Sequence, residues 1–250
     1  MITEGGNVFG GGDIPKNSVP GIVNTVQLDL PSGIKGIPDI GSAGYKVASG
    51  DLDMFVDAEQ LQQKFQAADE KSAKKALADY FAAKGYQVKL SGRNVHIAVP
   101  YETESGKQIA QVDLMVIADS ARVADWHQHG PRGMYSDPNF KAGHLYILLN
   151  SIGKHLGLKV DAFSGRVLRR DDNTVVADSR DKAAKILLNP KAKAADLYSV
   201  QSVMAALKND PDRESKLAQA RQDAEKGIIS LPEDVLPGTA TWFRNMSDKL

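Results

Sequence analysis

A Gly-Ser turn, followed about ten residues later by an alternating acidic segment, is the feature that most constrains this chain. Gly41 and Ser42 form the turn, and Asp51-Leu52-Asp53 forms the acidic segment. Side chains alternate between the two faces of a β-strand, so Asp51 and Asp53 share one face while Leu52 points into the core. The pattern predicts a strand that presents two carboxylates beside a glycine turn, which suits a divalent metal and a nucleoside triphosphate.

A third acid stands alone in an apolar segment, residues 111–116. Asp113 faces away from its apolar neighbours there, and a lone acid in a strand needs a partner or a metal. If this strand runs beside the Asp51 strand, as an antiparallel sheet permits, three carboxylates meet on one open face. We therefore expect Asp51, Asp53 and Asp113 to lie together.

Three clustered carboxylates repel one another, and binding divalent cations keeps them ionised. Ligands that are all oxygen atoms favour Mg²⁺ or Mn²⁺ over zinc. Two such ions about 3.5 to 4 Å apart activate an attacking hydroxyl and neutralise a leaving pyrophosphate. In this scheme Asp51 and Asp53 bridge the metals, and Asp113 ligates the catalytic metal and helps to remove the hydroxyl proton.

The glycine turn predicts the triphosphate site. Gly41 lets backbone amides approach the phosphates, Ser42 donates through its hydroxyl, and a helix starting at the turn would direct its N-terminus at the anion. Lys46 would pair with the β- or γ-phosphate. Ser49 and Gly50 would relax the backbone where metal and phosphates crowd together.

The run GSAGYKVASGDLD at residues 41–53 resembles the signature of the DNA polymerase β nucleotidyltransferase superfamily, and VDLM at residues 112–115 resembles its third-carboxylate strand. The resemblance covers roughly residues 18–118. A weaker likeness over residues 140–188 is to the palm-to-thumb segment of family X polymerases, and the chain is also similar to phage-encoded nucleotidyltransferases. Such a family transfers a nucleoside monophosphate from an NTP or dNTP to a hydroxyl and releases pyrophosphate.

Residue by residue, Gly41 and Ser42 match the family's triphosphate-binding pair, and Asp51, Asp53 and Asp113 match its metal triad. The spacing between the two motifs is slightly shorter than in family X polymerases, and the arginines of that turn are replaced here. No helix-hairpin-helix segment precedes the palm-like region, which argues against template-directed repair. The thumb-like region favours a nucleic-acid 3′ end, DNA or RNA, as the acceptor.

The predicted fold class is α+β. A polymerase β-like palm, with a mixed and mostly antiparallel sheet flanked by helices, is expected over residues 1–120. A smaller, mainly helical thumb-like region with a short hairpin is expected over residues 121–250, with the boundary in a loop between 120 and 138. Predicted strands span 34–37, 50–56, 86–90, 95–99 and 109–117. Three helices are predicted in the same region: one begins near residue 18, one follows Asp57, which is its expected N-cap, and one begins at residue 70.

In the second region the sequence predicts a helix over 139–155, on which Tyr146 and Asn150 could reach the nucleotide. His127 and His129 are interpreted as part of an ordinary polar loop. Basic residues between 154 and 170 could follow a phosphate backbone. A hairpin is predicted from strands 160–168 and 174–176, helices are predicted over 179–188, 194–208 and 213–226, and the tail from 230 is predicted to be irregular.

Composition limits the alternatives. The 31 basic and 31 acidic residues balance to a net charge of zero, and the absence of cysteine excludes disulfides and cysteine-bound zinc. No apolar run approaches the roughly 20 residues of a membrane span, and the start does not read as a signal peptide, so we expect a cytoplasmic protein, in the host cytoplasm if phage-encoded. The oligomeric state is open, as are transfer to a protein or small-molecule hydroxyl and a non-catalytic, nucleotide-binding or virion-associated role.

Overall fold

The chain forms two compact units, and both mix helices with strands. A computed structural model describes residues 8–38, 40–45, 47–104, 106–127 and 142–225. Lys46, His129 and the tail from 230 therefore lie outside the described residues. Within those ranges, no helix has the length and apolar character needed to cross a membrane. The units are Met1–Gln128 and His129–Leu250.

A five-stranded mixed sheet in the order β2-β4-β7-β6-β5 forms the centre of the first unit. The two strands that carry the acids, β4 and β7, are parallel neighbours, so the antiparallel pairing expected for them is wrong. Parallel neighbours need a long crossover, and here the chain between them forms two helices and the β5–β6 hairpin. The strands are β2 (Gly36–Ile37), β4 (Leu52–Asp57), β5 (Val88–Ser91), β6 (Asn94–Thr103) and β7 (Gly106–Ile117).

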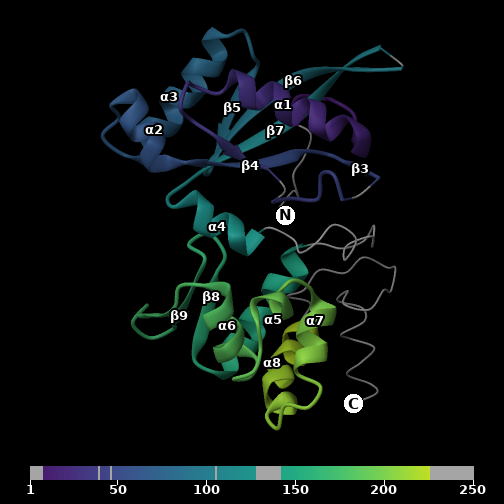
Figure 1. Cartoon of the computed structure of the whole chain (residues 1–250), viewed down its shortest axis with the longest axis vertical. Helices are drawn as coiled ribbons and strands as arrows, with labels where there is room; N and C mark the ends of the chain where they lie inside the picture. The colour runs from purple at the N-terminus through teal and green to yellow at the C-terminus, as the bar shows by residue number, and fades with distance from the viewer. Residues whose placement is uncertain (1–7, 39, 46, 105, 128–141, 226–250) are drawn as a thin grey trace. The chain divides into compact units, whose positions relative to one another are not determined.

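One face of this sheet is apolar and is covered by α1, α2 and α3 (Figure 1). Met54, Ile97 and Leu114 project from three adjacent strands into this core and are fully buried. Burial of each such side chain contributes about 1.5 to 3 kcal/mol, so the core fixes which face of every strand points inward. The helices are α1 (Val19–Asp29), α2 (Ala58–Phe65) and α3 (Glu70–Ala83).

The opposite face carries the polar side chains and, at one end, helix α4 (Ser120–His127). The sequence predicted a loop around Trp126, which is wrong, because Val123, Ala124 and Trp126 are buried along one side of a short helix. The Asp57 side chain connects the start of α2 to the start of α4. Its side chain caps α2 by accepting from the Gln60 amide, as predicted, and its second oxygen accepts from the amide and hydroxyl of Ser120.

A small ladder closes the loop that contains the glycine turn. β1 (Ile14–Pro15) pairs antiparallel with β3 (Ala48–Ser49), and a single turn of 3-10 helix, η1 (Lys16–Ser18), leads from β1 into α1. The Lys16 amide also donates to the Val47 carbonyl. The loop is therefore tied at Val47 and at β3 to the segment that leads into α1.

The second unit packs helices with a three-stranded sheet, not the predicted two-stranded hairpin. The Asp161 side chain accepts from the amides of Phe163 and Ser164, and this turn ends the first strand early. The predicted helix over 194–208 is broken, because Ser199 caps a new helix with its hydroxyl. The elements are α5 (Ala142–His155), β8 (Leu158–Asp161), β9 (Arg166–Arg169), β10 (Val175–Ala177), α6 (Arg180–Leu187), η2 (Ala194–Leu197), α7 (Val200–Ala206) and α8 (Arg213–Glu225).

Candidate functional site

Two of the predicted acids lie side by side on the open face of the first unit's sheet. Asp53 on β4 and Asp113 on β7 are directly paired in the parallel register, and both point away from the apolar core. Asp51 immediately precedes β4 and is close enough for its charge to act on Asp53. The structure thus brings the three predicted carboxylates to one region, although through a parallel pairing.

The charged form of Asp53 is disfavoured by its surroundings. Burial, the largest cause, together with the negative charges of Asp51 and Asp113 raises the pKa of Asp53 from 3.8 to about 7. A carboxyl group whose pKa is raised in this way keeps its proton up to neutral pH, unless a bound cation stabilises the charged form. The side chain is also close to Gly41, because a Cβ at position 41 would overlap an Asp53 carboxylate oxygen. A side chain at position 41 would therefore displace Asp53.

Asp113 has a different environment, since it is only 4% exposed and is held by hydrogen bonds. Its Oδ1 lies 2.7 Å from His96 Nδ1 and accepts from Gln111 Nε2 at 2.9 Å. The far nitrogen of His96, Nε2, lies 2.6 Å from the Ser91 hydroxyl. Asn94 approaches the other oxygen, Oδ2, only at 3.4 Å. The partner that a lone acid requires is therefore a histidine from the neighbouring strand.

These side chains form a row across the sheet. Lys89 on β5 pairs with His96 on β6, His96 pairs with Asp113 on β7, and Asp113 pairs with Asp53 on β4. Paired residues of neighbouring strands share a face. The row therefore runs from Lys89 at the edge strand, through His96, to Asp113 and Asp53 beside the glycine turn.

The described start of the chain crosses the same polar face. The Val8 amide donates to Gln111 Oε1 at 2.7 Å, and Lys89 Nζ donates to the Val8 carbonyl at 2.6 Å. Lys89 also lies 5.5 Å from the centre of the Phe9 ring. Gly11 packs so tightly against the Ile109 carbonyl that a side chain would overlap it. This segment is therefore part of the frame around Asp113.

The Gly-Ser turn is compact and partly closed on itself. The Ser42 hydroxyl donates to the Ser49 hydroxyl at 3.3 Å, so two of the predicted phosphate-binding residues meet next to Gly41. The helix expected to start at this turn is absent from residues 40–45, which form bends and turns. Gly50 is exposed and has open space where a Cβ would stand. Lys46 belongs to the residues that are not described.

The donors at this site fit a hard divalent cation, although they do not form a closed ligand set. Across residues 8–127 and 142–225, apart from the short gaps, no three acidic, histidine or cysteine side chains are grouped as metal ligands. Carboxylates that repel one another separate when no cation holds them, and one oxygen of Asp113 is already committed to His96 and Gln111. Asp51, Asp53 and the remaining oxygen of Asp113 are hard oxygen donors of the kind that Mg²⁺ and Mn²⁺ prefer.

Sequence reasoning missed His96, Gln111 and Ser91. His96 interrupts the apolar strand segment 95–99 at a position that faces away from the core, and Gln111 stands two residues before Asp113 on the same face. Both therefore carried a signal, namely a polar side chain on the face of the third acid. Gln111 is joined to Asp113 by their spacing on one strand, and His96 is joined to it by the β6–β7 register, which the sequence did not supply.

Other predicted contacts with substrate have structural partners instead. Asn150 holds β8, because its amide group accepts from the Val160 amide at 2.9 Å and donates to the Val160 carbonyl at 3.1 Å. In the β8–β10 sheet, Lys159 donates to Asn173 and Arg170 donates to the Leu158 carbonyl. The exposed bases Lys154, His155 and Arg169 remain on the surface of that unit.

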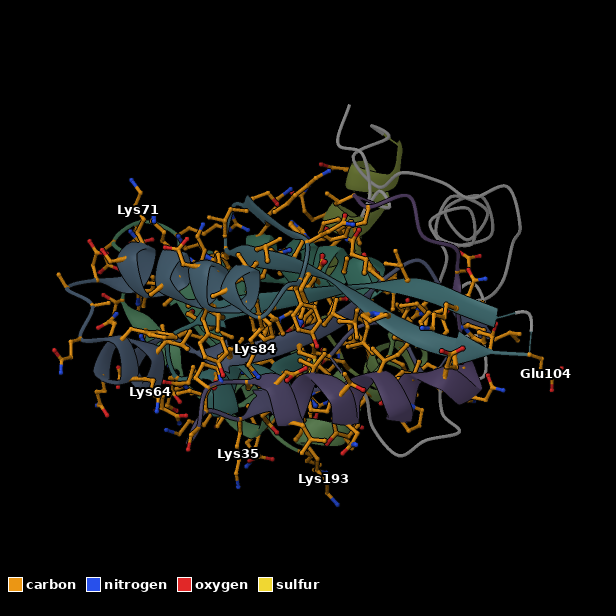
Figure 2. The ribbon with its side chains drawn as sticks, turned by 90° about the horizontal axis from the view of Figure 1, so that it is seen from above. Lys35, Lys64, Lys71, Lys84, Glu104 and Lys193 are labelled. Carbon is orange, nitrogen blue, oxygen red and sulfur yellow. The ribbon has the colours of Figure 1, made fainter. Side chains whose placement is uncertain are left out.

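Lysines also lie on the helical side of the first unit. The side chains of Lys64 on α2 and Lys71 on α3 project outward (Figure 2), and both helices cover the apolar face of the sheet. Lys84 ends in an ion pair of 2.7 Å with Asp29. These cations therefore lie on the side of the sheet opposite to Asp53 and Asp113.

Comparisons with known proteins leave the family resemblance as an expectation. No protein-family model matches the chain, and no curated protein matches it. The case for a function therefore depends on the geometry of the site itself.

Proposed function

We propose that the chain is a Mg²⁺-dependent nucleotidyltransferase that moves a nucleoside monophosphate from an NTP or dNTP onto a hydroxyl group. The observation that carries the proposal is the side-by-side pairing of Asp53 and Asp113 on parallel strands, beside Asp51 and a glycine turn that contacts Asp53. Structural acids in a sheet are commonly neutralised by neighbouring bases. Here burial and two like charges raise the pKa of Asp53 to about 7, so the site favours a cation.

The three acids would hold the metal, and Mn²⁺ would substitute for Mg²⁺. When bound, the metal would neutralise charge on the triphosphate and lower the pKa of the attacking hydroxyl. Gly41 packs directly against the Asp53 carboxylate, and the paired hydroxyls of Ser42 and Ser49 beside it would be donors for phosphate oxygens. Asp113 would accept the hydroxyl proton through the oxygen not committed to His96.

The acceptor that we propose is a nucleic-acid 3′ end. The exposed bases of the second unit, Lys154, His155 and Arg169, support a polyanionic partner. Two acids, Asp171 and Asp172, are exposed in the turn between β9 and β10 of the same unit.

The test is transfer of label from α-³²P NTPs and dNTPs with Mg²⁺ or Mn²⁺, using DNA, RNA, protein and small-molecule acceptors in separate reactions. We expect Asp53→Asn and Asp113→Asn to lower transfer about a thousandfold, equivalent to about 4 kcal/mol of transition-state stabilisation. Asp79→Asn, an exposed acid on α3, is the matched control and should leave the rate unchanged.

The acceptor arms separate the alternatives. Label in protein or in a small molecule, with none in DNA or RNA, would replace the proposed acceptor while keeping the reaction. Nucleotide binding without turnover in any arm would favour a non-catalytic binding protein. Full activity of Asp53→Asn would overturn the assignment of the site.

A further inference from the structure

We infer that His96 is a positioning residue for Asp113: it fixes one carboxylate oxygen, Oδ1, and leaves Oδ2 as the single oxygen that faces the metal. The inference rests on the proposed function, because it assigns a role within the same site. It adds a residue that the sequence motifs do not contain.

The two oxygens of Asp113 differ sharply in their partners. Oδ1 has His96 Nδ1 at 2.7 Å and Gln111 Nε2 at 2.9 Å, both within the normal range for hydrogen bonds. Among the described residues, the partner of Oδ2 is the Asn94 amide at 3.4 Å, beyond the usual range. Because two donors occupy Oδ1, the carboxylate cannot present both oxygens equally to a cation. Asp113 is therefore set as a one-oxygen ligand.

The donors are themselves held in place. Ser91 binds the far nitrogen of His96, which prevents the ring from turning, and Nδ1 must carry a hydrogen to donate to a carboxylate. Gln111 is oriented in the same way, because its Oε1 accepts from the Val8 amide and its Nε2 must then point to Asp113. His96 and Asp113 are each at most 6% exposed, so water does not compete readily for these bonds.

Such an arrangement has a known physical effect on metal sites. A group that hydrogen-bonds a metal ligand fixes the orientation of that ligand, and its removal typically costs tenfold to a hundredfold in metal affinity or activity. Loss of His96 would free the Asp113 carboxylate to rotate about its final bond. The metal would then meet a less well oriented oxygen.

The first experiment measures Mn²⁺ affinity by electron paramagnetic resonance, without nucleotide or turnover. We expect His96→Leu to weaken binding about tenfold to a hundredfold. We expect His96→Asn to restore most of the affinity, because Asn Nδ2 can occupy the place of His Nδ1. Asn94→Ala is the matched control on the same carboxylate and should change affinity less than about twofold, since its bond is already long.

The outcomes separate this inference from the proposed function. If the wild-type chain binds no Mn²⁺, or binds it as well after Asp113→Asn, the proposed metal site is wrong. If Asp113→Asn abolishes binding but a folded His96→Leu binds as the wild type does, only the positioning role is wrong.

A second measurement needs no destabilising variant. In chain labelled with ¹⁵N-histidine, we expect the His96 ring to carry a hydrogen on Nδ1, with its signals identified by their loss in His96→Asn. A ring that carries its only hydrogen on Nε2 would overturn the inference, because Nδ1 could then not donate to Asp113.

Discussion

The two units differ in whether a buried charged side chain has a neighbour of opposite charge. In the second unit, Lys216 and Asp210 form an ion pair of 2.9 Å with side chains 8% and 3% exposed, and Lys216 also donates to the Leu188 carbonyl. In the first unit, Asp53 is influenced by burial and by two further negative charges, which together raise its pKa to about 7. The Lys216–Asp210 pair is neutral within itself, whereas the two charges that act on Asp53 are both negative.

This difference distinguishes a structural charge from a functional one. A buried ion pair with its hydrogen bonds made is complete, so removal of one partner should harm only the fold. Like charges gathered on an open face lower stability, and a fold gains from them only through a ligand of opposite charge. Substitutions in the two clusters should therefore have opposite effects on stability.

The largest effect is expected in the second unit. Lys216→Met should destabilise the fold by about 3 to 5 kcal/mol, because it leaves Asp210 buried without its cation. Urea unfolding followed by circular dichroism measures the change. Lys185→Met, at an exposed pair on α6, is the control and should have little effect. Equal stability of Lys216→Met and the wild type would remove the contrast between the units.

The next expected effect is an increase in stability, opposite in sign to the first. The pKa of Asp53 is raised on folding, so its favourable contribution is complete below pH 3.8 and is lost as the pH rises through about 7. Asp53→Asn should therefore stabilise the metal-free chain at pH 8 by about 2 to 4 kcal/mol, and much less at pH 4. Urea unfolding in EDTA at the two pH values tests this. Added Mg²⁺ should reduce the advantage at pH 8, whereas a variant less stable than the wild type at pH 8 would contradict it.

A smaller effect is expected at the glycine turn. Gly41→Ala should displace the Asp53 carboxylate, because the new Cβ would overlap it, and we expect transfer and Mn²⁺ affinity to fall about tenfold. Gly50→Ala lies in open space and is the matched control. Parallel loss in both variants would mean that the loop as a whole, and not the contact with Asp53, is sensitive.

Local periodicity was sufficient to predict the faces of the strands. Asp53 and Asp113 were expected to point away from the core, and both do, because alternation along a strand is a local property. The cap at Asp57 was also predicted correctly from neighbouring residues. The direction of β4 relative to β7 was not, because it is decided by how the intervening helices pack on the sheet.

The partners of Asp113 show the same limit. Gln111 reaches Asp113 Oδ1 from two residues away on the same strand, whereas His96, 17 residues away, reaches that oxygen only through the register of β6 and β7. Register depends on contacts between strands, which a single sequence does not reveal. Helix α4 was missed for a related reason: its buried side chains pack against Phe55 and Ile117 of the sheet.

The bond from the Val8 amide to Gln111 gives the first described residues of the chain a role in the site. Without it, the Gln111 amide would lose the bond that orients its oxygen and would hold its donor against Asp113 less firmly. A chain shortened to begin after Gly11 would keep Asp51, Asp53 and Asp113 and still have an altered ligand. Enzymological comparisons of trimmed and full-length forms would then report on the geometry of Asp113 and not only on folding.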